Sequence, residues 1–323
     1  MDVARQIHAY VGDALGQVER MLEQVLSETE GLGARTSLHL LKAGGKRVRP
    51  LVTLLSGRVF GAADRDVIPI AAAAEMIHMA TLVHDDVIDH ADTRRGRPTV
   101  NAVWGNYPAV LTGDFMLARA MSLIVDQGHP RVLKVMSDMI YEMCEGEIAQ
   151  HEAKGRLDLT EEEYLRRIGK KTARFFQACA ESGALLGGAS PAQVRAMGQF
   201  GYFLGMAFQV VDDLLDLTGE APVLGKPVGS DLMEGVLTLP VIHMLQHPRY
   251  RDQLLSRLRE VPPPPDDMAA IVHLIRQNGA LRYTEEVAQG YVLRAMGLLA
   301  ELPATEATRL LAEMVVALGQ RKS

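Results

Sequence analysis

Two runs of the form Asp-Asp-x-x-Asp are the residues of this chain best suited to chemistry. They are Asp85-Asp86-Val87-Ile88-Asp89 and Asp212-Asp213-Leu214-Leu215-Asp216, and each ends a strongly apolar, helix-like segment. Carboxylates are costly to crowd together in an apolar setting unless cations neutralise them. Mg²⁺ prefers oxygen ligands, takes one or two carboxylates and completes its shell with water and substrate phosphates. The two runs therefore predict a magnesium site for a heavily anionic ligand.

The spacing inside each run suits a shared ligand. On a helix, successive residues turn by about 100°, so Asp85 and Asp89 lie about 40° apart on one face, with Asp86 to the side. The second run repeats this geometry. A single run is more often a solvated helix end or a cap, but two runs, each followed by basic residues, favour a metal site. An EF-hand is disfavoured because its ligand spacing, central Gly and terminal Glu are missing.

Basic residues supply the cations that a phosphate ligand needs. The segment Gly44-Gly45-Lys46-Arg47-Val48-Arg49-Pro50 is a basic turn that opens an apolar helix, where a phosphate can bind. Asp92-Thr93-Arg94-Arg95-Gly96 follows the first Asp run, and two adjacent Arg side chains can serve two different diphosphates. The alternative is that these arginines pair with Asp89 or Asp92 at the surface. Further cations that can converge on the same ligand are Lys170, Lys171 and Lys226.

The elements that must position these residues are predicted to be helices. Good helix formers fill the periodic segments, strand-like alternation is nearly absent, and aromatic residues make up 5% of the chain. Gly and Pro collect at the breaks, for example from Gly187 to Pro191 and from Val261 to Pro265. Thr160-Glu161-Glu162-Glu163 is typical of a capping box. No break is long enough for an interdomain linker, so we expect residues 1–323 to form one all-α domain around a central space.

Composition excludes several classes of protein. The formal charge of −6 is modest and no Lys/Arg-rich tract is present, so we expect no nucleic-acid partner. The two cysteines lack metal-type spacing, which fits a reducing compartment. Residues 1–26 carry charges throughout and do not form a secretory signal. The apolar stretch from Ile68 to Val83 is too short and too polar to span a membrane, so we expect a cytoplasmic protein.

The motifs taken together resemble the trans-type polyprenyl diphosphate synthases, the family of farnesyl and geranylgeranyl diphosphate synthases and their long-chain relatives, such as heptaprenyl and octaprenyl diphosphate synthases. The resemblance covers residues from about 30 to about 300. It implies an all-α, isoprenoid-synthase-like helical bundle around a central active-site cavity, and a homodimer. The motifs that carry it, in order, are GGKRVRP (44–50), EMIHMATLVHDDVIDHADTRRG (75–96), TGDF (112–115), KKTA (170–173), FQVVDDLLD (208–216), GKPVGSDL (225–232) and TLP (238–240).

The resemblance also implies a role for each matching residue. Mg²⁺ ions that bridge to the allylic diphosphate would be held by Asp85, Asp86, Asp89, Asp212, Asp213 and Asp216. The allylic diphosphate would be bound by Arg94, Lys171 and Lys226. The reacting centre, where positive charge develops, would be lined by the catalytic residues Lys171, Thr172 and Gln209. The diphosphate of isopentenyl diphosphate would be bound by Lys46, Arg49, His78 and Arg95. His78 carries weight only through the resemblance, since a lone His on an apolar helix is usually a core residue.

The implied reaction needs no side-chain nucleophile. Metal ions and basic side chains stabilise the departing pyrophosphate, so the allylic C–O bond ionises. The double bond of isopentenyl diphosphate then attacks the cation, and a proton leaves, in this family to the released pyrophosphate. Positioning of the two substrates supplies much of the acceleration. An apolar cavity keeps water from quenching the cation.

Residues before the first Asp run are expected to set product length. Short-chain members of the family carry a large aromatic residue at the position of Ala80 or Thr81, whereas both are small here. We therefore expect a product of about C30 to C45, limited by the room in the tunnel, and a quinone side chain as its fate. A greasy product can draw the enzyme to a membrane surface. Alternatively, Ala80 and Thr81 are simply well packed, and Ile77 or another helix closes the tunnel early, which gives a farnesyl or geranylgeranyl product.

One departure and two other classes of protein need weighing. After Asp231 and Leu232 the family commonly reads Arg-Glu-Gly-Lys, whereas this chain has Val236 in place of the Lys, which puts part of the allylic-diphosphate site in doubt. A class I terpene cyclase shares the first Asp run but normally has a different second metal motif. A non-catalytic partner subunit normally loses one or both Asp runs, and both are intact here.

Overall fold

The computed structural model describes residues 3–28, 30–219 and 228–320. Across these residues the protein is helical, as predicted, and its strands are limited to one short antiparallel pair, β1 (Thr93–Arg94) and β2 (Arg97–Pro98). Contacts divide the chain into two compact units. Unit 1 comprises Met1–Ser137, Ala178–Gly198 and Ala300–Leu311, and unit 2 comprises Asp138–Gln177, Gln199–Leu299 and Ala312–Ser323. A single domain over residues 1–323 stays a prediction.

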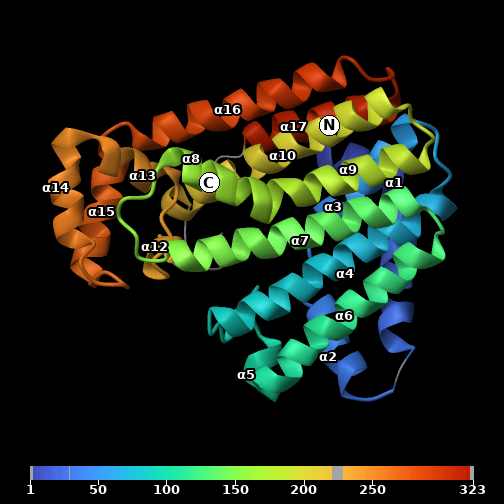
Figure 1. Ribbon diagram of the computed structural model, residues 1–323, viewed down its shortest axis with the longest axis horizontal. Coiled ribbons are helices and arrows are strands. Elements are labelled where there is room, and N and C mark those ends of the chain that lie inside the picture. The colour runs from blue at the N-terminus through green and yellow to red at the C-terminus, as the bar shows by residue number, and fades with distance from the viewer. Residues whose placement is uncertain (1–2, 29, 220–227, 321–323) are drawn as a thin grey trace. The chain divides into compact units, whose positions relative to one another are not determined.

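Unit 1 is built around one buried helix. Its helices are α1 (Val3–Ser27), α2 (Leu32–Leu41), α3 (Val48–Val59), α4 (Asp64–Ile88), α5 (Val100–Trp104) and α6 (Asn106–Asp126). Helix α4 packs against both α3 and α6 (Figure 1). By length and composition α4 and α6 are both apolar enough to cross a membrane, but 78% of the most apolar window of α4 is buried inside the protein. Burial in the core therefore accounts for the apolar character of α4.

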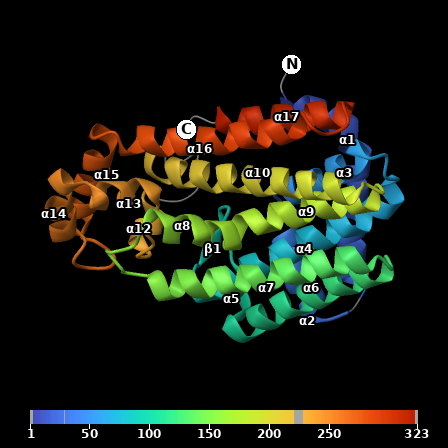
Figure 2. The same ribbon diagram turned by 45° about the horizontal axis from the view of Figure 1, so that its top comes forward.

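Unit 2 contains α8 (Glu161–Ile168), the π-helical segment η1 (Gly169–Ala173), α12 (Ser230–Met233), α13 (Leu239–Gln246), α14 (Pro248–Arg257), α15 (Pro265–Gln277) and α16 (Ala280–Leu299). Helices α13, α14 and α15 lie beside one another, and α13 and α15 also contact α16 (Figure 2). Four helices have residues in both units: α7 (Pro130–Ala153), α9 (Arg174–Leu186), α10 (Pro191–Thr218) and α17 (Glu306–Gly319). The predicted breaks are confirmed where α9 gives way to α10 and α14 to α15.

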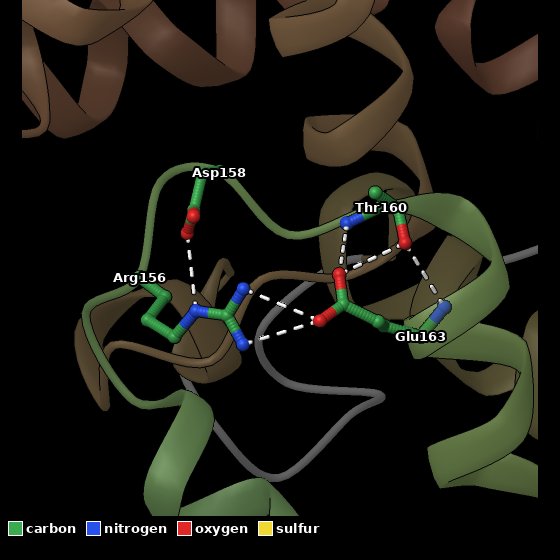
Figure 3. A network of polar contacts seen from close by, with 4 residues as sticks. All are labelled: Arg156, Asp158, Thr160 and Glu163. Carbon is green, nitrogen blue, oxygen red and sulfur yellow. Dashed lines mark hydrogen bonds and ion pairs between the residues drawn. The ribbon is translucent and has the colours of Figure 1, made fainter.

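The start of α8 is fixed by the predicted capping box, which is confirmed (Figure 3). The Thr160 hydroxyl accepts a hydrogen bond from the Glu163 amide at 3.2 Å, and the Glu163 carboxylate accepts one from the Thr160 amide at 2.8 Å. Arg156 bridges Asp158 and the same Glu163 carboxylate. A capping interaction of this kind contributes about 1 kcal/mol to helix stability. It sets the register of a short helix that carries Tyr164 into the buried part of unit 2.

Candidate active site

The first Asp run lies at the carboxyl end of α4. The helix ends at Ile88, and Asp89 is its C-cap, with its amide donating to the Asp85 carbonyl at 2.8 Å. This bond continues the helical turn, so the predicted placement of Asp85 and Asp89 on one face is confirmed. Their exposure differs from that of the residue between them: Asp85 is half-buried and Asp89 exposed, whereas Asp86 is 1% exposed.

A β-hairpin directly after α4 supplies the partner of Asp86. Arg95 and Gly96 have positive φ values of 53° and 71°, as a tight two-residue hairpin turn requires. The turn places Arg94 so that its Nε and Nη2 atoms both lie 2.8 Å from Asp86 Oδ1. Burial raises the pKa of Asp86, and the Arg94 charge opposes that rise. The other oxygen, Asp86 Oδ2, is buried and accepts no hydrogen bond from any residue the structure describes, which suits it to face a cation.

Four basic side chains gather near His78. Burial lowers the pKa of His78 well below its ordinary value, and the charges of Arg49, Arg95, Arg94 and Arg47 lower it further. The imidazole is therefore neutral at pH 7 and can donate one hydrogen bond. The four arginines in this group outnumber the three carboxylates that bond them: Glu75 accepts from Arg47 Nη1 at 2.7 Å, Glu19 also accepts from Arg47, and Asp86 accepts from Arg94. Such an excess of positive charge favours an anionic ligand.

Gly45 lets this basic cluster form. A Cβ atom at that position would lie 3.0 Å from an Nη1 atom of Arg47 and 3.0 Å from one of Arg95. The turn between α2 and α3 thus lies against the hairpin that follows α4. Lys46 is exposed on the same turn, and Arg49 is half-buried in the first turn of α3. All four residues predicted to bind isopentenyl diphosphate are therefore in unit 1: His78, Arg49 and Arg95 within one electrostatic cluster, and Lys46 on its turn.

The second Asp run lies near the end of α10, and its three carboxylates also differ in exposure. Asp212 is exposed, whereas Asp213 and Asp216 are 2% and 1% exposed. Asp216 Oδ1 accepts a hydrogen bond from the Ser230 hydroxyl at 2.7 Å, and the Asp216 carbonyl accepts one from the Gly229 amide at 2.9 Å. These contacts attach the end of α10 to the start of α12.

Asp213 is the centre of a buried network. Its Oδ2 atom accepts from the Tyr164 hydroxyl at 2.6 Å, and its Oδ1 atom accepts from Gln209 Nε2 at 2.8 Å. Gln209 Oε1 in turn accepts from the Thr172 hydroxyl at 2.7 Å. Burial raises the pKa of Asp213 to about 8, with the Asp231 charge adding to the rise. The predicted reacting-centre residues Thr172 and Gln209 are thus brought together.

Thr172 and Lys171 lie on the π-helical segment η1. A π turn inserts an extra residue and occurs frequently at functional sites. Helix α7 approaches this segment closely, since a Cβ atom at Gly146 would lie 2.8 Å from the Lys171 amide nitrogen. Lys171 is half-buried and forms a 2.7 Å ion pair with Glu147, so a diphosphate would compete with that carboxylate for it. Lys226 lies outside the described residues.

Several residues of these clusters escaped the sequence analysis as functional candidates. Glu75 could have been found from the sequence, because it is a charged residue that interrupts an apolar stretch. Tyr164 looks like an ordinary core residue of an amphipathic helix. Ser230 lies far from Asp216 in sequence, and although it falls within the quoted motif GKPVGSDL, the resemblance assigned it no role. Among the described residues, no three His, Cys, Asp or Glu side chains are close enough to form a metal site by themselves. Bound metal would therefore need oxygens from the substrate as well.

Comparisons with known proteins agree with these features. A model of the polyprenyl synthetase family matches residues 33–275. Heptaprenyl diphosphate synthase component 2 of Geobacillus stearothermophilus is 41% identical over 320 residues, which cover 98% of this chain and 98% of that protein. The short chain isoprenyl diphosphate synthase of Methanothermobacter thermautotrophicus is 36% identical over 307 residues, covering 92% of this chain and 94% of that protein. The structure of a polyprenyl synthase from Caulobacter crescentus CB15, complexed with calcium and isoprenyl diphosphate, has a TM-score of 0.92 at 33% identity, covering 99% of this chain and 98% of that one.

The basic cluster predicts that pyrophosphate stabilises the protein without added metal. A ligand at about 100 times its dissociation constant adds roughly 2.7 kcal/mol, which raises the melting temperature by several degrees. Arg95→Ala should lose at least half of that rise in a thermal-shift measurement. Arg65→Ala is the matched control, because the Arg65 side chain is 87% exposed. An Arg95→Ala protein that keeps the full rise would show that the cluster does not bind the anion.

Proposed function

The chain belongs to the polyprenyl synthetase family and is a trans-prenyltransferase, and we propose that it joins isopentenyl diphosphate head to tail to farnesyl or geranylgeranyl diphosphate to give a long all-trans polyprenyl diphosphate. It has the all-α isoprenoid synthase fold of its structural neighbours. The observation that carries the proposal is the basic cluster around His78 in unit 1, whose Arg94 bonds Asp86 of the first Asp run and whose Arg49 and Arg95 would bind isopentenyl diphosphate. A terpene cyclase, which uses one diphosphate substrate, has no need of such a cluster.

We propose Mg²⁺ as the metal, in keeping with the oxygen donors present. The more accessible carboxylates, Asp85, Asp89 and Asp212, would be the direct ligands, and Asp86 would contribute its remaining oxygen. Asp216, whose Oδ1 atom accepts a hydrogen bond from Ser230, would hold the end of α10 in place. When bound, the metal neutralises the pyrophosphate that leaves the allylic substrate. The calcium in the Caulobacter crescentus complex supports a divalent cation.

The chain's own side chains would divide the remaining work. Arg94 and Lys171, with Lys226, would bind the allylic diphosphate, and Lys46, Arg49 and Arg95 would bind isopentenyl diphosphate. The neutral imidazole of His78 would donate a hydrogen bond to the same diphosphate. Oxygens of Thr172 and Gln209 would face the positive charge that develops as the allylic C–O bond breaks. The new C–C bond forms as the double bond attacks, and the proton that is lost passes to the released pyrophosphate.

The proposed product length is about C30 to C45, set by the room below Asp85. On α4, Thr81 lies four residues before Asp85, about 40° away on the same side. Ala80 shares a side instead with His84, whose Nε2 atom lies 3.1 Å from the Val110 carbonyl of α6, and Ala80 is 2% exposed. Thr81 is therefore better placed than Ala80 to limit chain growth. The buried Ile77 lies one turn below.

We also propose that the protein is a homodimer, that it is cytoplasmic, and that its product serves quinone biosynthesis. A homodimer is supported by an apolar stripe on α6, interrupted by the exposed Asp114, where Tyr107, Leu111 and Val125 are 77%, 48% and 56% exposed and share one face. A cytoplasmic enzyme that meets the membrane only through its product fits this composition. A product of this length suits a quinone side chain. The related heptaprenyl diphosphate synthase protein is named component 2. The assay below therefore also tests whether this chain needs an accessory chain.

The product assay tests the function directly. The purified chain, incubated with Mg²⁺, farnesyl diphosphate and labelled isopentenyl diphosphate, should give products of about C30 to C45, because small residues leave the tunnel open. Products of only C15 or C20 would contradict the long-chain proposal. No extension at all by the purified chain would show that it does not act alone.

Thr81→Phe should shorten the product, because the ring would fill the space directly below Asp85. Ala80→Phe should do so too, with a stability loss of about 1–3 kcal/mol from overpacking on the α6 side. Thr81→Val, which keeps the size and removes the hydroxyl, is the matched control and should give wild-type products. The readout is the length distribution of labelled products. An unchanged distribution for both Phe variants would place the end of the tunnel elsewhere.

Leu111→Glu should dissociate the homodimer, because it puts a charge into the apolar stripe on α6. Sedimentation should give twice the 35.3 kDa chain mass for the wild type and the single-chain mass for the variant. Leu293→Glu is the control, since Leu293 is 70% exposed on α16. A wild-type protein that sediments as a single chain would contradict the homodimer.

A further inference from the structure

Tyr164 has a hydrogen bond that its place in the core does not require. The residue is 0% exposed on α8, and its hydroxyl donates to Asp213 Oδ2 at 2.6 Å. A buried Phe would fill the same space without bringing a polar atom into the core. The hydroxyl therefore has a use that packing alone does not explain.

Each of the two oxygens of Asp213 already accepts a short hydrogen bond from a protein donor. Tyr164 occupies Oδ2, and Gln209 Nε2 occupies Oδ1 at 2.8 Å. Asp212 is exposed, and one oxygen of Asp86 accepts no hydrogen bond from the described residues. Asp213 thus differs from the other members of the two Asp runs: its carboxylate faces protein donors on both sides. We call Asp213 an anchor in this sense: its carboxylate holds other side chains of the protein in place.

The anchor fixes the direction of the Gln209 amide. Because Nε2 donates to Asp213, Oε1 must point the other way, where it accepts the Thr172 hydroxyl at 2.7 Å. Gln209 and Asp213 are four residues apart on α10, so they lie on the same side of the helix. The chain of contacts runs from α8 through α10 to η1 and ends on Thr172. Each link has a donor and an acceptor in good geometry.

A second buried side chain holds Tyr164 in place. The guanidinium carbon of Arg167 lies 5.6 Å from the centre of the Tyr164 ring, and its Nη2 atom donates to the Leu237 carbonyl at 2.7 Å. Arg167 is 6% exposed. Its positive charge also lies near the Asp213 carboxylate. The ring of Tyr164 is thus fixed by Arg167, and its hydroxyl by Asp213.

We propose that Tyr164 is a positioning residue for prenyl transfer, acting through Asp213 to hold Gln209 and Thr172 toward the reacting centre, and that Asp213 serves as this anchor and not as a metal ligand. The inference rests on the proposed role of Thr172 and Gln209 at that centre. Without the Tyr164 hydroxyl, Asp213 Oδ2 loses its donor, and the carboxylate can turn away from Gln209. Gln209 and Thr172 would then no longer be fixed where positive charge develops.

Tyr164→Phe tests the inference, because it keeps the ring on Arg167 and removes only the hydroxyl. The single-turnover rate of one condensation should fall about 10- to 100-fold, as expected for loss of a precise orientation. The Michaelis constant for isopentenyl diphosphate and the Mg²⁺ concentration for half-maximal rate should stay within about twofold, since neither the basic cluster nor the metal ligands are altered. Tyr283→Phe is the matched control: its hydroxyl bonds Glu161, outside the network, and its rate should be that of the wild type.

A second measurement separates positioning from a general structural role. In a Thr172→Ala background, Tyr164→Phe should cost almost nothing further, because its effect passes through Thr172. Full additivity of the two losses would overturn the inference. If Tyr164→Phe does not fold, Asp213→Asn takes its place, with the same expected rate loss and an unchanged Mg²⁺ requirement.

The outcomes are distinct from those of the proposed function. A wild-type protein that extends no allylic diphosphate would refute the function itself. An active wild type with a fully active Tyr164→Phe variant would refute the positioning role alone. A Mg²⁺ requirement that rises severalfold in Asp213→Asn would identify Asp213 as a metal ligand and overturn the second half of the inference.

Discussion

Buried carboxylates need hydrogen-bond donors, and that constraint organises the surroundings of both Asp runs. Asp86, Asp213 and Asp216 are each at most 2% exposed, and each accepts hydrogen bonds from a neighbouring segment. An unpaired charge at these positions would cost several kcal/mol. The partners therefore also serve as local anchors: the hairpin is held to α4 by Arg94, and α12 is held to α10 by Ser230. Residues next to them in sequence remain accessible and can meet metal and substrate.

The distribution of charge then explains how one fold can hold two diphosphates. Unit 1 carries a cluster of four arginines that outnumber the carboxylates bonded to them, and its His78 is kept neutral. We expect such a cluster to bind an anion without the help of a metal. The Asp runs instead repel an anion until divalent cations bridge the two. Two diphosphates that differ only in their hydrocarbon part can thus be held in different ways. The diphosphate of isopentenyl diphosphate would stay attached to its substrate, and that of the allylic substrate would leave as pyrophosphate.

Sequence patterns sufficed for the helical fold and for the capping box at Thr160, because each depends on local periodicity or on a motif of fixed spacing. The hydrogen bond between Thr172 and Gln209 was not predicted, because the resemblance gave only their place at the reacting centre. The hairpin at Arg95-Gly96 was not predicted, since two-residue strands leave no alternation to detect. The unequal exposure of the six aspartates could not be predicted from the sequence either. A pattern of Asp-Asp-x-x-Asp gives the angle around the helix but not which neighbour covers each carboxylate. Tyr164 and Ser230 are such neighbours: Tyr164 has the sequence context of an ordinary helix residue, and Ser230 falls in a quoted motif that gives no hint of its contact with Asp216.

The central claim is that the aspartates of the two runs have different tasks: Asp85, Asp89 and Asp212, with the remaining oxygen of Asp86, bind metal, whereas Asp213 bonds protein donors. Its most direct test is a crystal structure with Mn²⁺, isopentenyl diphosphate and a non-ionising thiolo analogue of farnesyl diphosphate, in which anomalous scattering locates the metal. We expect Mn²⁺ to contact the carboxylates of Asp85, Asp89 and Asp212 and the diphosphate of the analogue. Tyr164 and Gln209 should still be hydrogen-bonded to Asp213. Mn²⁺ bound directly by Asp213, with the Tyr164 contact broken, would contradict the account.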